Sequence, residues 1–175
     1  MRGVSLALRS ILWTLAFPGF FAGYVPWRYF GVSDVDFRWR DPVQVIGAVL
    51  IASGAALLIA CIWEFARRGR GTLSPVDPPK ELVVQGLYRY VRNPMYLSVL
   101  TIVAGEIILT RSGPLLVYWI VFFGCANLFV MGYEEPTLRR QFGESYKRYA
   151  RNVGRWMPGP GQRAKSKEQR SKRGH

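Results

Sequence analysis

The strongest constraint on the fold of this chain is a set of four apolar stretches that lie between charged residues. They are Ser10–Trp27, Pro42–Trp63, Asn93–Thr110 and Ser112–Tyr133, and only the third is interrupted, by Glu106. Each has roughly the 17–25 residues that a helix needs to cross a bilayer. The sequence therefore predicts an all-α, polytopic membrane protein with about four transmembrane helices.

The basic residues are distributed unevenly around these stretches. If the N-terminus faces the cytoplasm and all four stretches span, 20 Lys and Arg residues fall on the cytoplasmic side and 4 on the opposite side. By the positive-inside rule this bias places both termini in the cytoplasm. It also explains the net charge of +13 as attraction to the headgroups of membrane lipids, so no nucleic-acid partner is expected.

The cysteine and histidine content excludes several kinds of site. Cys61 and Cys125 lie in separate apolar stretches without metal-binding spacing, and they are interpreted as core residues. The one histidine, His175, ends a polar tail. A Ser-His-Asp triad and a histidine-ligated metal are therefore excluded, and no metal site is expected.

A polar, aromatic and basic segment, residues 86–96 (GLYRYVRNPMY), opens directly into the third apolar stretch. Pro94 suits the first turn of that helix, because its missing N–H would have no partner there. Arg92 can bind a carboxylate or phosphate through two parallel hydrogen bonds, and Asn93 can donate and accept at once. Two interpretations stay open at this point: a binding site, or an interfacial helix start with an aromatic belt.

A second polar segment, residues 134–138 (EEPTL), follows the last apolar stretch. The intervening sequence Arg111-Ser112-Gly113-Pro114 is typical of a tight turn, which predicts an antiparallel hairpin of the third and fourth stretches. That hairpin returns Glu134 and Glu135 to the membrane surface that holds Arg92 and Asn93. We therefore expect the two polar segments to meet.

An amphipathic helix is predicted after Pro136. Apolar and aromatic residues recur there at helical spacing: Leu138, Phe142, Tyr146, Tyr149, Val153 and Trp156. Basic residues occupy the other face: Arg139, Arg140, Lys147, Arg148 and Arg151. This helix should lie on the cytoplasmic membrane surface or cap the bundle. Residues 1–158 then form a single transmembrane domain, and 159–175 a disordered basic tail.

Taken together, the two segments resemble the isoprenylcysteine carboxyl methyltransferase and phospholipid methyltransferase superfamily. In that family G-x-Y-x-x-x-R-[HN]-P-x-Y precedes a helical hairpin, and E-E-x-x-L with F-G-x-x-Y-x-x-Y follows it. The matching residues here are 86–96, 134–138 and 142–149, and the resemblance extends from Trp63 to Pro158. The chain departs from the pattern at Asn93, where relatives often have histidine, and at Asn152, where they often have arginine.

The resemblance implies an integral membrane methyltransferase that uses S-adenosylmethionine and acts on a lipophilic or lipidated acceptor. That acceptor would be an isoprenylcysteine carboxylate or a phospholipid amine. Arg92 is expected to bind a carboxylate, and Glu135 is expected to take a proton from an amine acceptor, so these two are the predicted catalytic residues. The predicted cofactor-binding residues are Asn93, Pro94, Tyr96, Glu134 and Glu135.

Two features outside these motifs allow more than one interpretation. Glu106 is an ionisable residue within an apolar run, and its expected partner is Asn127 or Arg111. Such residues hold either a structural hydrogen bond or a function. The loop at 64–81, rich in Gly, Pro and Arg, either lies near the mouth of a cofactor site or contacts lipid headgroups.

Two other functional classes compete with the methyltransferase. Membrane sterol-type reductases resemble this architecture and also end in a region like Y-x-x-Y, but they would use NADPH. A non-catalytic membrane protein with a partner-recruiting basic tail is the third reading. The pairing of the two motifs favours the methyltransferase.

Overall fold

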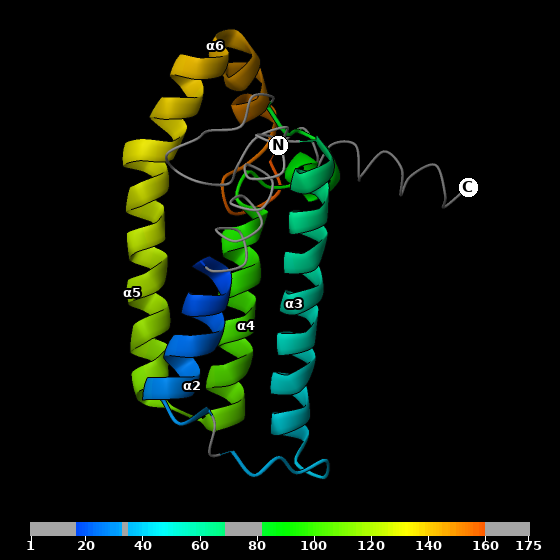
Figure 1. Ribbon diagram of the computed structural model, residues 1–175, viewed down its shortest axis with the longest axis vertical. Coiled ribbons are helices and arrows are strands. Elements are labelled where there is room, and N and C mark those ends of the chain that lie inside the picture. The colour runs from blue at the N-terminus through cyan, green and yellow to red at the C-terminus, as the bar shows by residue number, and fades with distance from the viewer. Residues whose placement is uncertain (1–16, 33–34, 69–81, 160–175) are drawn as a thin grey trace, which may run out of the picture.

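The computed structural model describes residues 17–32, 35–68 and 82–159, and these form a bundle of long helices with a helical cap at one end (Figure 1). In chain order the elements are η1 (Phe20–Tyr24), α2 (Val25–Tyr29), α3 (Pro42–Arg68), η3 (Gly86–Arg89), α4 (Pro94–Thr110), α5 (Gly113–Phe129), η4 (Val130–Glu134) and α6 (Glu135–Asn152). All named elements in these ranges are helical, which confirms the all-α prediction. The beginning of the first apolar stretch, most of the 64–81 loop and the basic tail lie outside the described residues.

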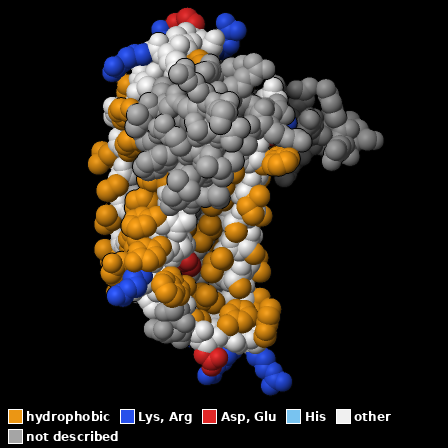
Figure 2. Space-filling view, viewed as in Figure 1, with side chains coloured by type: hydrophobic (Ala, Val, Ile, Leu, Met, Phe, Trp, Pro, Cys, Tyr) orange, Lys and Arg blue, Asp and Glu red, His pale blue; other side chains and the backbone are white. Residues whose placement is uncertain are grey.

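Two helical stretches are long and apolar enough to cross a membrane. These are Pro42–Glu64, with a mean hydropathy of 2.7, and Gly113–Asn152, whose most apolar part has a mean hydropathy of 2.0. Only 17% and 22% of these apolar windows are buried inside the protein, so most of their side chains face outward. Figure 2 shows hydrophobic side chains along the long helices, with Lys and Arg concentrated toward the two ends. Helix α4 is apolar but shorter.

Helices α3 and α4 pack closely through glycines. A Cβ atom added to Gly105 would lie 2.6 Å from the carbonyl oxygen of Gly47, and one added to Gly54 would lie 2.7 Å from Ile102 Cγ1. In lipid there is no hydrophobic drive between helices, so close backbone approach supplies the attraction. Gly47 and Gly54 therefore form a packing face of α3 against α4.

The helical segment formed by η1 and α2 packs against the α4–α5 hairpin. Ala22 belongs to the same buried cluster as Val103 and Phe122. The Tyr118 hydroxyl donates a hydrogen bond to the carbonyl oxygen of Phe21 over 2.8 Å. This contact fixes the segment beside α5 and satisfies a phenol that would otherwise lie unpaired in an apolar environment.

The turn between α4 and α5 is as tight as predicted, and it makes the two helices antiparallel neighbours (Figure 1). Arg111 adopts a left-handed conformation with φ 53°, and its guanidinium lies 2.8 Å from the Asp41 carboxylate. The expectation that Glu106 pairs with Arg111 or Asn127 is wrong, because both side chains bond elsewhere. Glu106 is buried, and its Oε2 has no hydrogen-bond partner among the described residues.

Helix α6 continues from α5 through η4 and then bends back over the bundle (Figure 1). The bend lies at Gly143, with φ 52° and ψ −124°, a conformation that a residue with a Cβ avoids. The prediction of one helical face reaching Trp156 is wrong, because the helix is bent at Gly143 and ends at Asn152. The bend returns the second half of α6 to the segment that precedes α4.

Candidate active site

The two polar motifs meet at one end of the bundle through backbone contacts. The Arg92 N–H donates to the carbonyl oxygen of Gly154 over 2.9 Å, and Val91 and Gly154 form an isolated parallel bridge. The Tyr149 hydroxyl donates to the carbonyl oxygen of Tyr88 over 2.6 Å. We refer to residues 153–159, which follow α6, as the C-terminal loop. The C-terminal loop and the end of α6 therefore lie directly against residues 88–92, which precede α4.

Pro94 begins α4, as predicted. Asn93 precedes it with φ −122° and ψ 58°, and its side chain does not cap the helix. The Asn93 Nδ2 instead donates to the carbonyl oxygen of Arg155 over 3.4 Å. Asn93 is buried, so it ties the start of α4 to the C-terminal loop while its amide oxygen stays available as an acceptor.

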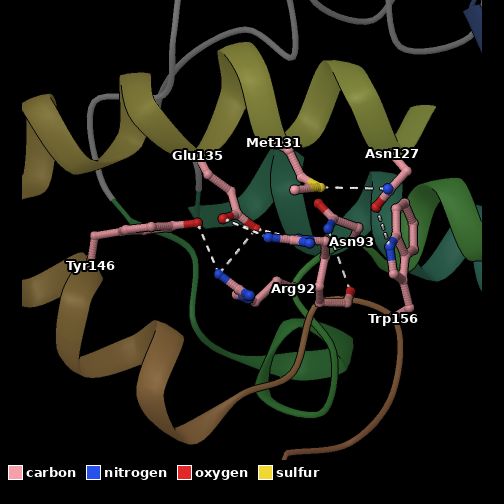
Figure 3. A network of polar contacts seen from close by, with 8 residues as sticks. Arg92, Asn93, Asn127, Met131, Glu135, Tyr146 and Trp156 are labelled. Carbon is pink, nitrogen blue, oxygen red and sulfur yellow. Dashed lines mark hydrogen bonds and ion pairs between the residues drawn. The ribbon is translucent and has the colours of Figure 1, made fainter. Parts of the chain in front are cut away.

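Glu135 lies at the centre of the polar network in Figure 3. Arg155 donates Nε to Oε1 over 2.6 Å and Nη2 to Oε2 over 3.0 Å, while Arg92 Nη1 lies 3.2 Å from Oε1. Burial alone would raise the pKa of Glu135, but the Arg155 hydrogen bonds and the Arg92 charge outweigh it, so the pKa lies below its ordinary value. Glu135 is therefore a fixed anion that orients two guanidinium groups.

Glu134, one residue earlier, has different surroundings. Burial raises its pKa to about 7, and the neighbouring Glu135 charge adds to this, whereas a hydrogen bond with the Tyr96 hydroxyl opposes it. The Glu134 Oε2 is buried without a hydrogen-bond partner among the described residues. Buried carboxyl oxygens are usually paired, so an unpaired one at a polar site indicates a position for a ligand.

Arg92 connects Glu135 to the second half of α6. Its Nη1 donates to the Tyr146 hydroxyl over 3.3 Å, and Figure 3 shows the Tyr146 hydroxyl and the Glu135 carboxylate both directed toward this guanidinium. The Arg92 side chain is only 13% exposed, and its Nε has no hydrogen-bond partner among the described residues. One donor of Arg92 is thus left available inside the site.

Next to this polar network is an aromatic contact that motif analysis did not identify. The Trp156 indole N–H donates to Asn127 Oδ1 over 3.0 Å, and Asn127 Nδ2 lies 3.5 Å from Met131 Sδ (Figure 3). The Trp156 ring packs edge-to-face against Phe123 and Tyr96. The signal in the sequence was an asparagine in an otherwise apolar helix, which in lipid requires a polar partner.

The structure thus brings together every residue that the sequence predicted for the site: Arg92, Asn93, Pro94, Tyr96, Glu134 and Glu135. Five of them contribute polar side chains, whereas the Pro94 ring begins helix α4. The sequence assigned no role to Arg155, which makes the closest contact with Glu135. Long apolar helices are typical of a helical membrane protein. The network of carboxylate and guanidinium groups at one end of the bundle is its candidate functional site.

Comparison with known proteins identifies its class. The family model described as phospholipid methyltransferase matches residues 43–145, more than half of the chain. The chain belongs to the phospholipid methyltransferase family, within the isoprenylcysteine and phospholipid methyltransferase superfamily, and this confirms the resemblance seen in the two motifs. A search of curated proteins finds no match to the chain. Family and fold together indicate an integral membrane methyltransferase rather than a reductase.

Proposed function

We propose that the chain transfers a methyl group from S-adenosylmethionine to a lipophilic acceptor. The observation that carries the proposal is a pair of buried atoms that have no hydrogen-bond partner within the residues that the structure describes: the acceptor Glu134 Oε2 and the donor Arg92 Nε. The amino acid end of S-adenosylmethionine carries both an ammonium and a carboxylate, so one ligand would satisfy both atoms. Each unpaired buried group costs about 1–3 kcal/mol, which ligand binding would recover.

The proposed roles follow from these contacts. Glu134 faces the cationic part of the cofactor or its ribose hydroxyls, and Arg92 faces a carboxylate. Tyr96 fixes Glu134 through its hydroxyl, and the free amide oxygen of Asn93 accepts a hydrogen bond from the cofactor. Glu135 acts on the cofactor through Arg92, which it holds in place at 3.2 Å. Pro94 contributes the helix start that presents Asn93.

The cofactor, when bound, supplies a methyl group that is already activated. The residues of the chain then need to hold donor and acceptor in line and to exclude water. A carboxylate acceptor is already a nucleophile at neutral pH, whereas an amine acceptor must first lose a proton. Where Glu134 faces the ribose hydroxyls and not the cofactor cation, it suits that step better than Glu135, because its pKa of about 7 lets it accept a proton near neutrality.

The proposed arrangement in the membrane has four transmembrane helices within one domain, residues 1–158, and both termini in the cytoplasm. Besides the two long spans, α4 has 17 residues and the first apolar stretch has 18, both within roughly the range that spans a bilayer. The site then lies where α4 and α5 meet the cytoplasmic surface. Cofactor enters from the cytoplasm and the acceptor from the bilayer.

Calorimetric titration of detergent-purified protein with S-adenosylmethionine, beside NADPH, tests this proposal. We expect S-adenosylmethionine to bind, and Glu134→Gln to weaken its binding by about tenfold, the scale of a hydrogen bond to a charged group. Glu144→Gln is the matched control, because that carboxylate is exposed and pairs only with Lys147. Binding of NADPH alone, or equal effects of the two variants, would overturn the proposal.

A further inference from the structure

Two consecutive residues of the C-terminal loop, Arg155 and Trp156, place their side chains in different environments, one polar and one apolar. Arg155 directs its guanidinium to Glu135, whereas Trp156 directs its indole to the aromatic contact on α5. Figure 3 shows the Trp156 ring beside Asn127, on the opposite side of the network from Tyr146. The backbone of one short loop therefore forms the border between the polar site and the apolar surface of α5.

The Trp156 ring is held in a fixed position. Its N–H is bonded to Asn127, and its ring centroid lies 5.3 Å from that of Phe123 and 6.2 Å from that of Tyr96, both in edge-to-face geometry. Tyr96 in turn hydrogen-bonds to Glu134. These contacts make a continuous series from α5 through Trp156 and Tyr96 to the Glu134 carboxylate, whose Oε2 has no hydrogen-bond partner in the described part of the chain.

The Asn127 end of this series of contacts lies at the apolar surface that faces lipid. On α5 and η4, next to Asn127, Leu128 is 72% exposed and Met131 is 49% exposed. Large apolar residues exposed on a membrane helix contact lipid chains. Trp156 is bonded to Asn127, so its indole lies between this exposed apolar surface and the Tyr96 ring that it contacts.

We propose that Trp156, supported by Phe123, contacts the apolar chain of the methyl acceptor and sets the specificity for that chain. This inference rests on the proposed function, since it names the residue that selects the acceptor of the same site. A rigid indole limits the width of an apolar chain beside it, and it touches the cofactor site only at the edge of the Tyr96 ring. Changing Trp156 should therefore alter acceptor use more strongly than cofactor binding.

The first test measures transfer without assuming an acceptor. Tritiated methyl groups are transferred from S-adenosylmethionine to lipids of native membranes, and the labelled products are separated by chain length and branching. We expect Trp156→Ala to change this product distribution and to raise the acceptor KM by about tenfold, the scale of lost hydrophobic pocket contacts. Trp156→Phe should keep the distribution and an affinity for S-adenosylmethionine within about twofold of wild type, because it retains an aromatic ring against Tyr96. In Trp156→Ala the acceptor KM should change more than the affinity for S-adenosylmethionine.

A second test does not depend on activity. A photoreactive benzoylphenylalanine replaces Trp156 in protein reconstituted into phosphatidylcholine and phosphatidylethanolamine vesicles, with the same replacement at Leu128 as the lipid-exposed control. Capture of lipid at both positions supports the proposal. Capture at Leu128 alone, or a Trp156→Ala variant that loses S-adenosylmethionine binding together with transfer, overturns it. Absence of S-adenosylmethionine binding in the wild type would refute the proposed function, and the capture result would still decide whether Trp156 contacts lipid.

Discussion

Glu134 and Glu135 are consecutive, yet their carboxylates have opposite surroundings. Glu135 accepts two hydrogen bonds from Arg155, at 2.6 and 3.0 Å, whereas Glu134 bonds to Tyr96 and keeps one buried oxygen without a partner among the described residues. The π-helical turn η4 ends at Glu134 and α6 begins at Glu135, so the helix changes its winding between the two. Two identical side chains thereby separate into one that holds the site together and one that is available to a ligand.

Replacing Glu135 should destabilise the protein. Glu135→Gln leaves the guanidinium groups of Arg92 and Arg155 without their anion, in a setting where the Glu135 side chain is only 10% exposed. Breaking such a pair costs about 3 kcal/mol, at the lower end of the range for buried pairs because Arg155 is 27% exposed. Thermal unfolding in detergent measures this as a lower Tm. An unchanged Tm would show that the network does not stabilise the fold.

The pKa of Glu134 predicts a pH dependence of cofactor binding. A cationic ligand needs the ionised carboxylate, so affinity should rise with pH and level off above about 7. Below that pH it should fall by about tenfold per unit. Without ligand the folded state holds this proton more tightly than the unfolded chain, so its contribution to stability decreases as pH rises from 4.5 to about 7. Titrations from pH 5.5 to 8.5 should show the affinity change in wild type, and Glu134→Gln should remove it.

The bend in α6 should depend on Gly143. A Cβ there meets no atom within 4 Å, so the cost of Gly143→Ala comes from its φ of 52° alone. We expect a loss of about 1–3 kcal/mol, the range for a residue held in a disfavoured backbone region. Gly132→Ala is the control, because that position is equally open and is not among the glycines with positive φ. Chemical denaturation of both variants should separate backbone strain from crowding.

The α3–α4 contact should be sensitive to a single methyl group. In Gly105→Ala the new Cβ would lie 2.6 Å from the Gly47 carbonyl oxygen and 2.8 Å from Ile51, so the helices must move apart. Overpacking of this kind costs about 1–3 kcal/mol. Gly124→Ala on α5, where nothing lies within 4 Å, should be neutral. Equal Tm values for the two variants would contradict the packing described here.

Orientation in the membrane can be tested by adding one cysteine at a time to a Cys125→Ser background, in which the remaining Cys61 is buried. Glu144→Cys and Asp36→Cys place exposed thiols at the two ends of the bundle. The positive-inside bias predicts that a membrane-impermeant maleimide labels position 144 only in inside-out vesicles, and position 36 only in right-side-out vesicles. Reversed labelling would invert the proposed topology.

Local sequence features predicted much of this structure because the physics behind them is local. Apolar length and charge boundaries predicted the long helices, the missing N–H of Pro94 predicted the start of α4, and the Arg111–Pro114 turn predicted the hairpin. From the hairpin followed the meeting of Arg92 with Glu135. These conclusions needed no knowledge of how distant side chains pack.

The parts that were not predicted depend on tertiary geometry. Helical spacing of aromatic residues continues through Gly143, so the pattern contained no sign that the backbone turns back there. The choice of Arg155 as the closest partner of Glu135 follows from the path of the C-terminal loop, which is set by contacts such as that of Asn93 with the Arg155 carbonyl. Asn127 was assigned to Glu106 because both lie in apolar helices, but the loop brings Trp156 closer.

The C-terminal loop also affects the order in which this protein is made. Chains are synthesised from the N-terminus, and α3, α4 and α5 all precede Arg155 and Trp156. The Arg92 segment and the hairpin are therefore synthesised before the residues that complete the site. A chain that ended after α6 would contain the hairpin but would lack two contacts, that of Glu135 with Arg155 and that of Asn127 with Trp156. Completion of this network thus depends on residues 153–159 and on the folding back of α6, and not on helices α3, α4 and α5 alone.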